Sequence, residues 1–168
     1  AEETYGAKCN MVEQGIFGQY DMASMVHLYD TNLPVPKLQA LSAYLYRFHG
    51  RAAHASSAPW EGANAFNGAQ LMFHAIDMLR QHTRPDAQFH GVILHGGEAP
   101  NIVPEEVALE LYIRALDKYD IQELVRKVDD CARGAAIATQ TTWDKEPAFP
   151  GFDNLKANPA GSAALAEV

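Results

Sequence analysis

An adjacent acidic pair and seven histidines are the groups of this sequence whose types can do chemistry. Glu2 and Glu3 stand at the start of the chain, and His27 follows 24 positions after Glu3. Carboxylates accept protons, and imidazole transfers protons or binds a metal ion. By themselves, Glu2 and Glu3 also suit a solvated terminus. His27 closes the apolar stretch 22–26, where an imidazole is costly unless it is hydrogen-bonded or bound to a metal.

Three more side chains stand out by their surroundings. His54 lies in a loop of small residues, 50–56, which lets another surface approach closely. Asn101 is the one amide of a loop, 100–104, that two prolines make rigid. Arg114 lies on the face of a predicted strand that points away from the core. Each of the three also fits an ordinary surface position, so surroundings alone do not assign a role.

Composition excludes several classes of protein. The chain has 168 residues, room for about one domain, and 48% of them are apolar, as in ordered globular proteins. Lys and Arg number 13 against 21 Asp and Glu, and the net charge of -8 argues against a nucleic-acid partner. No apolar run approaches the ~20 residues of a membrane span, and the acidic start does not resemble a signal peptide. The two distant cysteines, Cys9 and Cys131, favour a reducing compartment, and we expect a cytoplasmic protein.

A turn-rich stretch with two prolines, 30–36, divides a short leader from a longer block. In the leader, residues 8–14 are rich in helix formers and are followed by Gly15, a common residue after the end of a helix. The apolar stretch 22–28 predicts a short buried strand. The leader is therefore expected to be a helix followed by a strand.

The longer block alternates strands and helices. Strands are predicted at 40–49, 89–94, 106–115 and 141–145, and helices at 61–81 and 120–138. This βαββαβ order is typical of the ferredoxin-like α+β fold, an antiparallel sheet with two helices on one face. RNA-binding modules share that fold, but they need a basic surface and aromatic residues on the central strands, and this sequence provides neither. After Pro147 no regular structure is predicted.

Several motifs in combination resemble one enzyme family. GRAAHASSAPWEGANA (50–65) and GGEAPNIVPEEVALELYIRA (96–115) look like the lid, or dimerisation, domain of the co-catalytic metallopeptidases. That family includes carboxypeptidase G, aminoacylase and succinyl-diaminopimelate desuccinylase. The spacing AHA-x-x-x-PW-x-G-x-NA is typical of its p-aminobenzoyl-glutamate hydrolase and Xaa-basic dipeptidase branch. The start AEET-x-GAK and the end EPAFPGFDNLKANPA resemble the catalytic-domain segments that precede and follow the lid.

The resemblance implies a division of the chain into three parts. Residues 1–38 would belong to an α/β catalytic domain, 39–146 would form the ferredoxin-like lid, and 147–168 would begin the return into the catalytic domain. It also implies a metal-dependent hydrolase that cleaves the amide bond of an N-acyl amino acid, aminobenzoyl-glutamate or a dipeptide. Such an enzyme would be a homodimer joined through the lid domain.

The resemblance assigns roles to the acidic pair and to His27. Glu2 would be the general base that activates a metal-bound water, and Glu3 and His27 would be metal ligands. Two divalent ions are implied, with zinc favoured over manganese or cobalt. A metal lowers the pKa of bound water toward neutrality, and a neighbouring carboxylate accepts its proton. The glycine-rich run that follows the pair in the family is replaced in this sequence by residues 5–8, YGAK.

The same resemblance gives roles to the lid residues. His54 would stabilise the oxyanion that develops on the substrate, in this family often across the dimer in the partner's active site. Asn101 and Arg114 would hold the carboxylate end of the substrate through hydrogen bonds and charge.

The family has further metal ligands before the acidic pair and far beyond the lid, and this chain contains neither region. Glu3 and His27 are too few for a zinc site, which normally has at least three protein ligands. We therefore interpret the sequence as an internal fragment and expect the chain by itself to be inactive.

The alternative is a non-catalytic dimerisation module, in which a sheet edge and the first helix pair with a second copy and the metal-site residues are vestigial. Bound metal would favour the enzyme, and a metal-free dimer the module.

Overall fold

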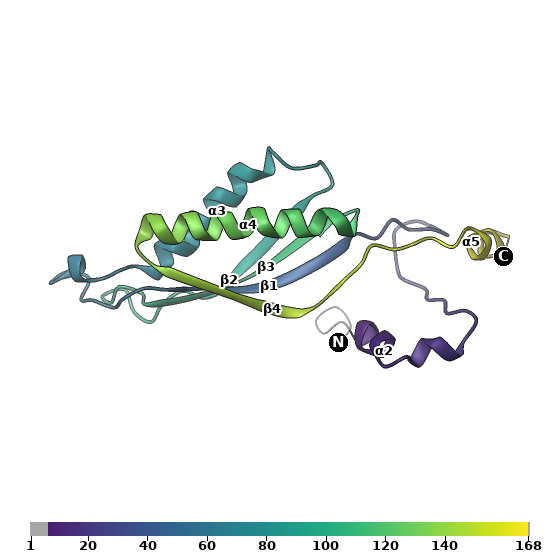
Figure 1. The fold of residues 1–168 in the computed structure, drawn as a ribbon, viewed down its shortest axis with the longest axis horizontal. Coiled ribbons are helices and arrows are strands. Elements are labelled where there is room, and N and C mark those ends of the chain that lie inside the picture. Colours follow the sequence, from purple (N-terminus) through teal and green to yellow (C-terminus); the bar gives the residue numbers. More distant parts are fainter. Residues whose placement is uncertain (1–6, 168) are drawn as a thin grey trace.

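The computed structural model describes residues 7–167, and at their centre lies a four-stranded antiparallel sheet (Figure 1). Its strands are β1 (Ala40–His49), β2 (Gln88–His95), β3 (Glu106–Ala115) and β4 (Thr142–Phe152). Their spatial order is β2-β3-β1-β4, and each neighbouring pair is antiparallel. The predicted ferredoxin-like α+β arrangement is confirmed.

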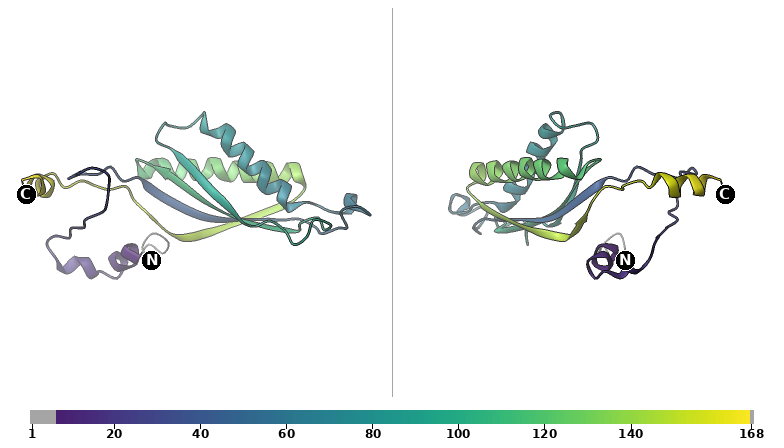
Figure 2. Two further views of the ribbon diagram at one scale, coloured as in Figure 1. Left: turned by 180° about the vertical axis from the view of Figure 1, so that it is seen from behind. Right: turned by 45° about the vertical axis from the view of Figure 1, so that its right-hand side comes forward.

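Two helices, α3 (Ala65–Arg80) and α4 (Lys118–Thr139), cover one face of this sheet (Figures 1 and 2). Each begins at a polar residue whose side chain accepts a backbone N–H, Asn64 from Phe66 and Asp117 from Tyr119. The apolar residues that recur every three or four positions on the helices meet alternate residues of the strands. The largest fully buried side chains between the two layers are Tyr46, Phe48, Met72, Ile76, Leu109, Leu111, Ile113, Val107 and Val128.

Tyr46 brings a hydroxyl into this core and finds a partner there. The hydroxyl donates a 2.8 Å hydrogen bond to Asp129 of α4, and Lys145 Nζ of β4 lies 2.6 Å from the same carboxylate. Burial, followed by the charge of Asp129, raises the pKa of Tyr46 well above its usual range, so the phenol remains a donor. No buried side-chain nitrogen or oxygen among residues 7–167 lacks a hydrogen-bond partner.

The leader agrees with the prediction in its first half only. Helix α2 (Ala7–Glu13) is followed by Gly15 at φ 71° and by the 3₁₀ helix η1 (Ile16–Gln19), which confirms the predicted helix. The strand predicted at 22–28 is wrong, because this segment forms no strand and exposes its apolar side chains, Val26 to 95%. A strand needs the backbone of a neighbour, and no segment within residues 7–167 pairs with this one.

Two elements differ from prediction by several residues at one end. Helix α3 starts at Ala65 instead of 61, because the 3₁₀ helix η2 (Pro59–Glu61) comes first. Strand β4 runs on through the proposed domain boundary at 146 to Phe152, since an edge strand tolerates proline. A short helix, α5 (Pro159–Ala166), follows where no structure was predicted. No helix between residues 7 and 167 combines the length and the apolarity that crossing a membrane requires.

Two helix glycines are expected to respond in opposite directions to alanine. A Cβ on Gly68 of α3 would lie 2.5 Å from Cδ1 of the buried Phe48, so Gly68→Ala should lower the free energy of unfolding by about 1–3 kcal/mol. A Cβ on Gly134 of α4 would meet nothing within 4 Å, so Gly134→Ala should raise that free energy by about 0.5–1 kcal/mol. Urea unfolding of the three chains measures both changes. Stabilisation by both substitutions would contradict the close approach of α3 to β1.

Candidate functional site

His54 and Asn101 lie in two loops that are joined at one end of the sheet. The loop after β1 carries His54, and the loop before β3 carries Asn101. The N–H of Ala55 donates to the carbonyl of Asn101 at 3.0 Å, and His54 forms an antiparallel bridge with Ile102. The pairing of β1 with β3 therefore continues beyond the strand ends and brings these two predicted site residues together.

Glycines and prolines shape both loops. Gly50 donates its N–H to the carbonyl of Glu105 at 2.8 Å, and a Cβ there would lie 2.0 Å from the carbonyl oxygen of Ala63. In the other loop Gly97 has φ 115° and packs against Pro104, which a Cβ would approach to 2.9 Å. A larger residue at either position would collide with another part of its own loop and distort that loop.

The ring of His54 is oriented by its own loop. Its Nδ1 accepts the backbone N–H groups of Ser56 at 3.3 Å and Ser57 at 3.2 Å. A nitrogen that accepts hydrogen bonds carries no proton, so the proton of the neutral ring is on Nε2. His54 thus presents an Nε2–H donor at the surface, the group that stabilisation of an oxyanion requires.

The side chain of Asn101 is exposed beside an open cavity of about 350 Å³. Residues of its own loop line this cavity: Gly96, Gly97, Glu98, Ala99, Pro100, Ile102 and Pro104. The end of the sheet that carries His54 and Asn101 is therefore open to a ligand or to a second chain.

Arg114 lies at the opposite end of the sheet. It pairs with Leu41 of β1 and Gln88 of β2, whereas Glu106, next to the Asn101 loop, is at the other end of β3. Eight steps along the extended chain lead from Glu106 to Arg114, which corresponds to roughly 26 Å. One copy of the chain therefore does not bring Arg114 together with His54.

Arg114 has a neighbour that sequence reasoning missed. Its Nε–H donates to Nε2 of His90 on β2 at 3.4 Å. His90 pairs with Tyr112, so it lies diagonally across from Arg114 on the sheet face without helices. Burial, and then the charges of Arg114 and Arg80, lower the pKa of His90. The contact depends on which residues of β2 and β3 face each other, and the patterns in the sequence do not predict that alignment.

His27 lies on the exposed segment between η1 and β1, with its Nδ1 2.8 Å from the carbonyl of Leu28. A carbonyl only accepts, so the proton is on Nδ1 and the lone pair of Nε2 is available, the tautomer of many metal-binding histidines. Glu2 and Glu3 lie outside the described residues. Between residues 7 and 167 no three His, Cys, Asp or Glu side chains gather as a metal site would require.

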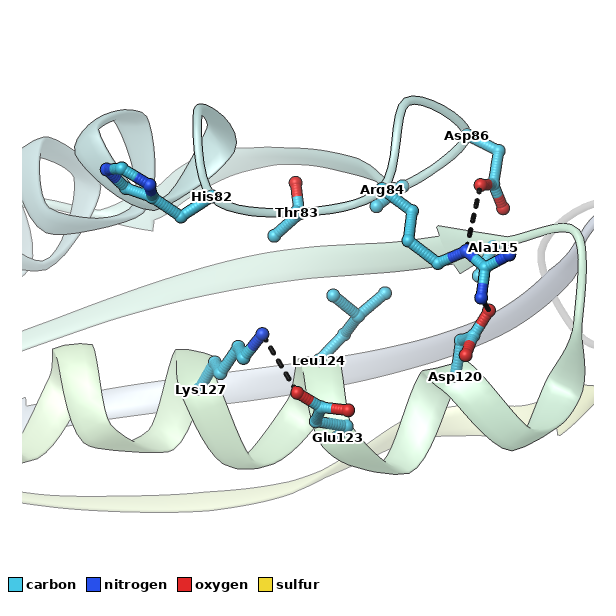
Figure 3. A pocket seen from close by; sticks show the side chains of 10 residues that line it. His82, Thr83, Arg84, Asp86, Ala115, Asp120, Glu123, Leu124 and Lys127 are labelled. Atoms are coloured by element: carbon cyan, nitrogen blue, oxygen red, sulfur yellow. Dashed lines mark ion pairs between the residues drawn. The ribbon is translucent and has the colours of Figure 1, made fainter.

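A second cavity, of about 270 Å³, lies between the end of α3 and α4 (Figure 3). Charged side chains of both signs surround it and pair with one another: Lys127 lies 2.9 Å from Glu123, and Arg84 lies 3.7 Å from Asp120. It contains none of the residues that the sequence selected as site residues. Its charges are already balanced locally, so nothing in this cavity indicates a catalytic role.

A family model and several relatives match this chain. The model of the peptidase dimerisation domain family matches residues 39–139. The Xaa-Arg dipeptidase of Mus musculus is 35% identical over 167 residues, which are 99% of this chain and 39% of the dipeptidase. One of the p-aminobenzoyl-glutamate hydrolase subunits of Escherichia coli is 32% identical over 148 residues, 84% of this chain and 30% of that protein. The chain thus spans less than two fifths of the length of these relatives.

Solved structures agree at the level of the fold. An aminobenzoyl-glutamate utilization protein from Klebsiella pneumoniae superposes with a TM-score of 0.66 at 20% identity, over 77% of this chain and 33% of its own. A hydantoinase/carbamoylase family amidase from Burkholderia vietnamiensis gives 0.71 at 18% identity, over 80% of this chain and 33% of its own. Family membership rests on the matched residues 39–139 and on the relatives at 35% and 32% identity. The chain belongs to the peptidase dimerisation domain family.

Proposed function

We propose that this chain is the lid and dimerisation portion of a metal-dependent hydrolase that cleaves the amide bond of N-acyl amino acids, aminobenzoyl-glutamate or dipeptides. The observation that carries the proposal is the joined pair of loops that presents His54 and Asn101 at one open end of the sheet. In this proposal residues 39–146 are the lid, and 1–38 and 147–168 are parts of the catalytic domain. The relatives named dipeptidase and hydrolase support the reaction class.

The roles of the acidic pair and of His27 are those that the family resemblance implies. Glu2 would take the proton of the attacking water, and Glu3 and His27 would hold a divalent ion, with zinc favoured over manganese or cobalt. The tautomer of His27, with its lone pair on Nε2, fits that role. When bound, two such ions would make the water acidic and polarise the scissile carbonyl.

The lid supplies the groups that contact the substrate. The Nε2–H of His54 donates to the oxygen that becomes negative as the carbonyl carbon turns tetrahedral. Arg114 and Asn101 bind the terminal carboxylate, Arg114 through its planar guanidinium and Asn101 through its amide N–H. Removal of one oxyanion donor typically lowers kcat by about 10²–10³.

The separation of His54 from Arg114 favours a site built from two chains. Arg114 lies beside the start of β1 and the end of β4, where both connections to the proposed catalytic domain leave the sheet. The N–H of Leu155 donates to the carbonyl of Leu38 at 3.1 Å, which ties these connections together. In our proposal Arg114 serves the active site of its own chain, and His54 and Asn101 reach the active site of the partner.

The two edges of the sheet differ in how well they suit a dimer. Strand β4 contains Pro147 and Pro150, which cannot donate to a further strand, whereas β2 contains no proline. Helix α3, which packs nearer to β2 than α4 does, exposes Met78 and Leu71. We propose a homodimer formed through β2 and α3. If no hydrolase activity accompanies it, the alternative of a non-catalytic dimerisation module applies.

The net charge and the two cysteines bear on the partners and the cell compartment of this protein. The net charge of -8 disfavours a nucleic-acid partner, and Cys9 and Cys131 are free thiols, as expected in a reducing compartment. We propose a cytoplasmic enzyme that acts on small dissolved substrates.

The dimer interface predicts unequal effects of two similar substitutions. Met78 of α3 is 72% exposed and Ile137 of α4 is 73% exposed, so a new carboxylate at either one meets comparable surroundings in a monomer. Met78→Glu should weaken dimerisation at least about tenfold, because a charge would be buried at the interface, and Ile137→Glu should leave it unchanged. Sedimentation equilibrium measures both dissociation constants. A monomeric parent chain would exclude the interface altogether.

The isolated chain should be inactive, because its two predicted ligands, Glu3 and His27, are fewer than the three that a zinc site normally has. Hydrolysis of an N-acetyl amino acid, aminobenzoyl-glutamate and an Arg-containing dipeptide is measured with zinc, manganese or cobalt added. Turnover by the pure 168-residue chain would refute the proposed division into lid and catalytic parts. The same assay on the chain extended by its flanking coding sequence should show activity, and an inactive extended protein with a metal-free dimer would support the module instead.

Mixed dimers of the extended protein test the site shared between two chains. His54→Ala and Glu2→Gln homodimers should each be inactive. In a random mixture about half of the dimers are mixed and each contains one complete site, so about a quarter of wild-type kcat should return. Recovery requires that His54 act in the partner's site. No recovery, with mixed dimers confirmed by mass spectrometry, would place His54 in the active site of its own chain.

A further inference from the structure

We propose that His90 is a positioning residue for Arg114: it occupies the Nε–H of the guanidinium and leaves the edge with both Nη groups for a carboxylate. The proposal rests on the proposed function, in which Arg114 binds the carboxylate of the substrate. It adds a residue that acts through Arg114 and an orientation in which the carboxylate is held.

The hydrogen bond between the two side chains can have only one direction. Arg114 Nε always bears a hydrogen, and His90 Nε2 lies 3.4 Å from it. His90 Nε2 must therefore be the acceptor, so the neutral ring carries its proton on Nδ1. A guanidinium offers two forked edges, one through Nε and one through both Nη groups. With Nε engaged by His90, the edge formed by the two Nη groups is the one that stays open.

A row of aromatic rings on the sheet face without helices holds the imidazole in place. The ring of His90 meets Tyr112 edge-on, with centroids 5.6 Å apart, and Tyr112 meets Phe149 edge-on at 5.4 Å. Phe149 in turn is buried with Leu41 and Ala43. This packing limits rotation of the imidazole, so its lone pair keeps pointing at Arg114.

No carboxylate among residues 7–167 neutralises the charge of Arg114, so the guanidinium can bind an anion. None of the salt bridges between side chains of residues 7–167 involves it. It is half-buried, and its hydrogen-bond partner is the neutral His90. A carboxylate of this chain in that place would neutralise the guanidinium, whereas an imidazole orients it and leaves its charge for an anion.

The charges around His90 keep it in the accepting form. Arg114 and Tyr112 face it from β3, and Arg80 lies nearby on α3. Burial is the largest cause that lowers its pKa, followed by Arg114 and Arg80. Because the pKa in the folded chain is below the ordinary value, the contact persists through neutral pH and is lost only as the pH falls through the lowered pKa.

The contact is tested first in the chain itself. Long-range ¹H–¹⁵N spectra assign the tautomer of each histidine, and His90 should carry its proton on Nδ1 at neutral pH. Its pKa should be displaced below the ordinary value of a histidine. An Nε2–H tautomer for His90 would overturn the proposal without any assay of activity.

The consequence is tested in the active extended protein. His90→Leu removes the acceptor and should raise KM for a carboxylate substrate about tenfold while kcat changes little, because binding is lost and not the chemical step. His90→Gln keeps an acceptor and should restore most of the affinity. His82→Leu is the matched control and should change neither constant. Wild-type KM should also rise as acid protonates His90, and this rise should be absent in His90→Gln.

Failure of the two proposals can be told apart with Arg114→Lys. If Arg114→Lys leaves KM unchanged, Arg114 does not bind the carboxylate, and that part of the proposed function is wrong. If Arg114→Lys raises KM but His90→Leu does not, the proposed function stands and the positioning role of His90 is wrong. Equal loss in His90→Leu and His90→Gln would likewise indicate a packing role for the ring.

Discussion

The pairing of β1 with β3 is the constraint on which the rest of this structure depends. Every residue of β1 from Ala40 to His49 faces one residue of β3 in an antiparallel register without a shift. That register fixes which end of the sheet each functional side chain occupies. It carries the two loops with His54 and Asn101 on one end and leaves Arg114 on the other. A slip by one residue would move every side chain to the wrong face.

The same ladder divides the molecule into a closed and an open face. Alternate residues of β3, such as Leu109 and Leu111, enter the core under α3 and α4, and those between them, such as Tyr112, lie on the side without helices. The larger core lies on the closed face, where Tyr46, Asp129 and Lys145 complete it with a satisfied polar group. A smaller cluster of Leu41, Ala43 and Phe149 is buried on the open face. Recognition is free to use the other face and the loops at the strand ends.

Sequence patterns predicted much of this fold because its signals are local. The alternation in 106–115 and the three-and-four spacing in 65–80 correspond to β3 and α3, and the small-residue and proline loops around His54 and Asn101 are where they were expected. The segment 22–28 was misread, because apolar residues indicate burial but not what buries them. No role was predicted for His90, because its contact with Arg114 depends on how two strands are aligned. The roles of all six candidate site residues remain predictions: Glu2, Glu3, His27, His54, Asn101 and Arg114.

The prolines of β4 have a consequence for assembly. If two copies join through their β2 strands, both outer edges of the combined sheet are β4 strands, and each contains Pro147 and Pro150. A third copy finds no comparable edge on which to continue the hydrogen-bond ladder. Association is then self-limiting: it closes at a two-fold pair and does not propagate into a fibre. The sequence of one edge strand would thus set the size of the assembly as well as protect it from aggregation.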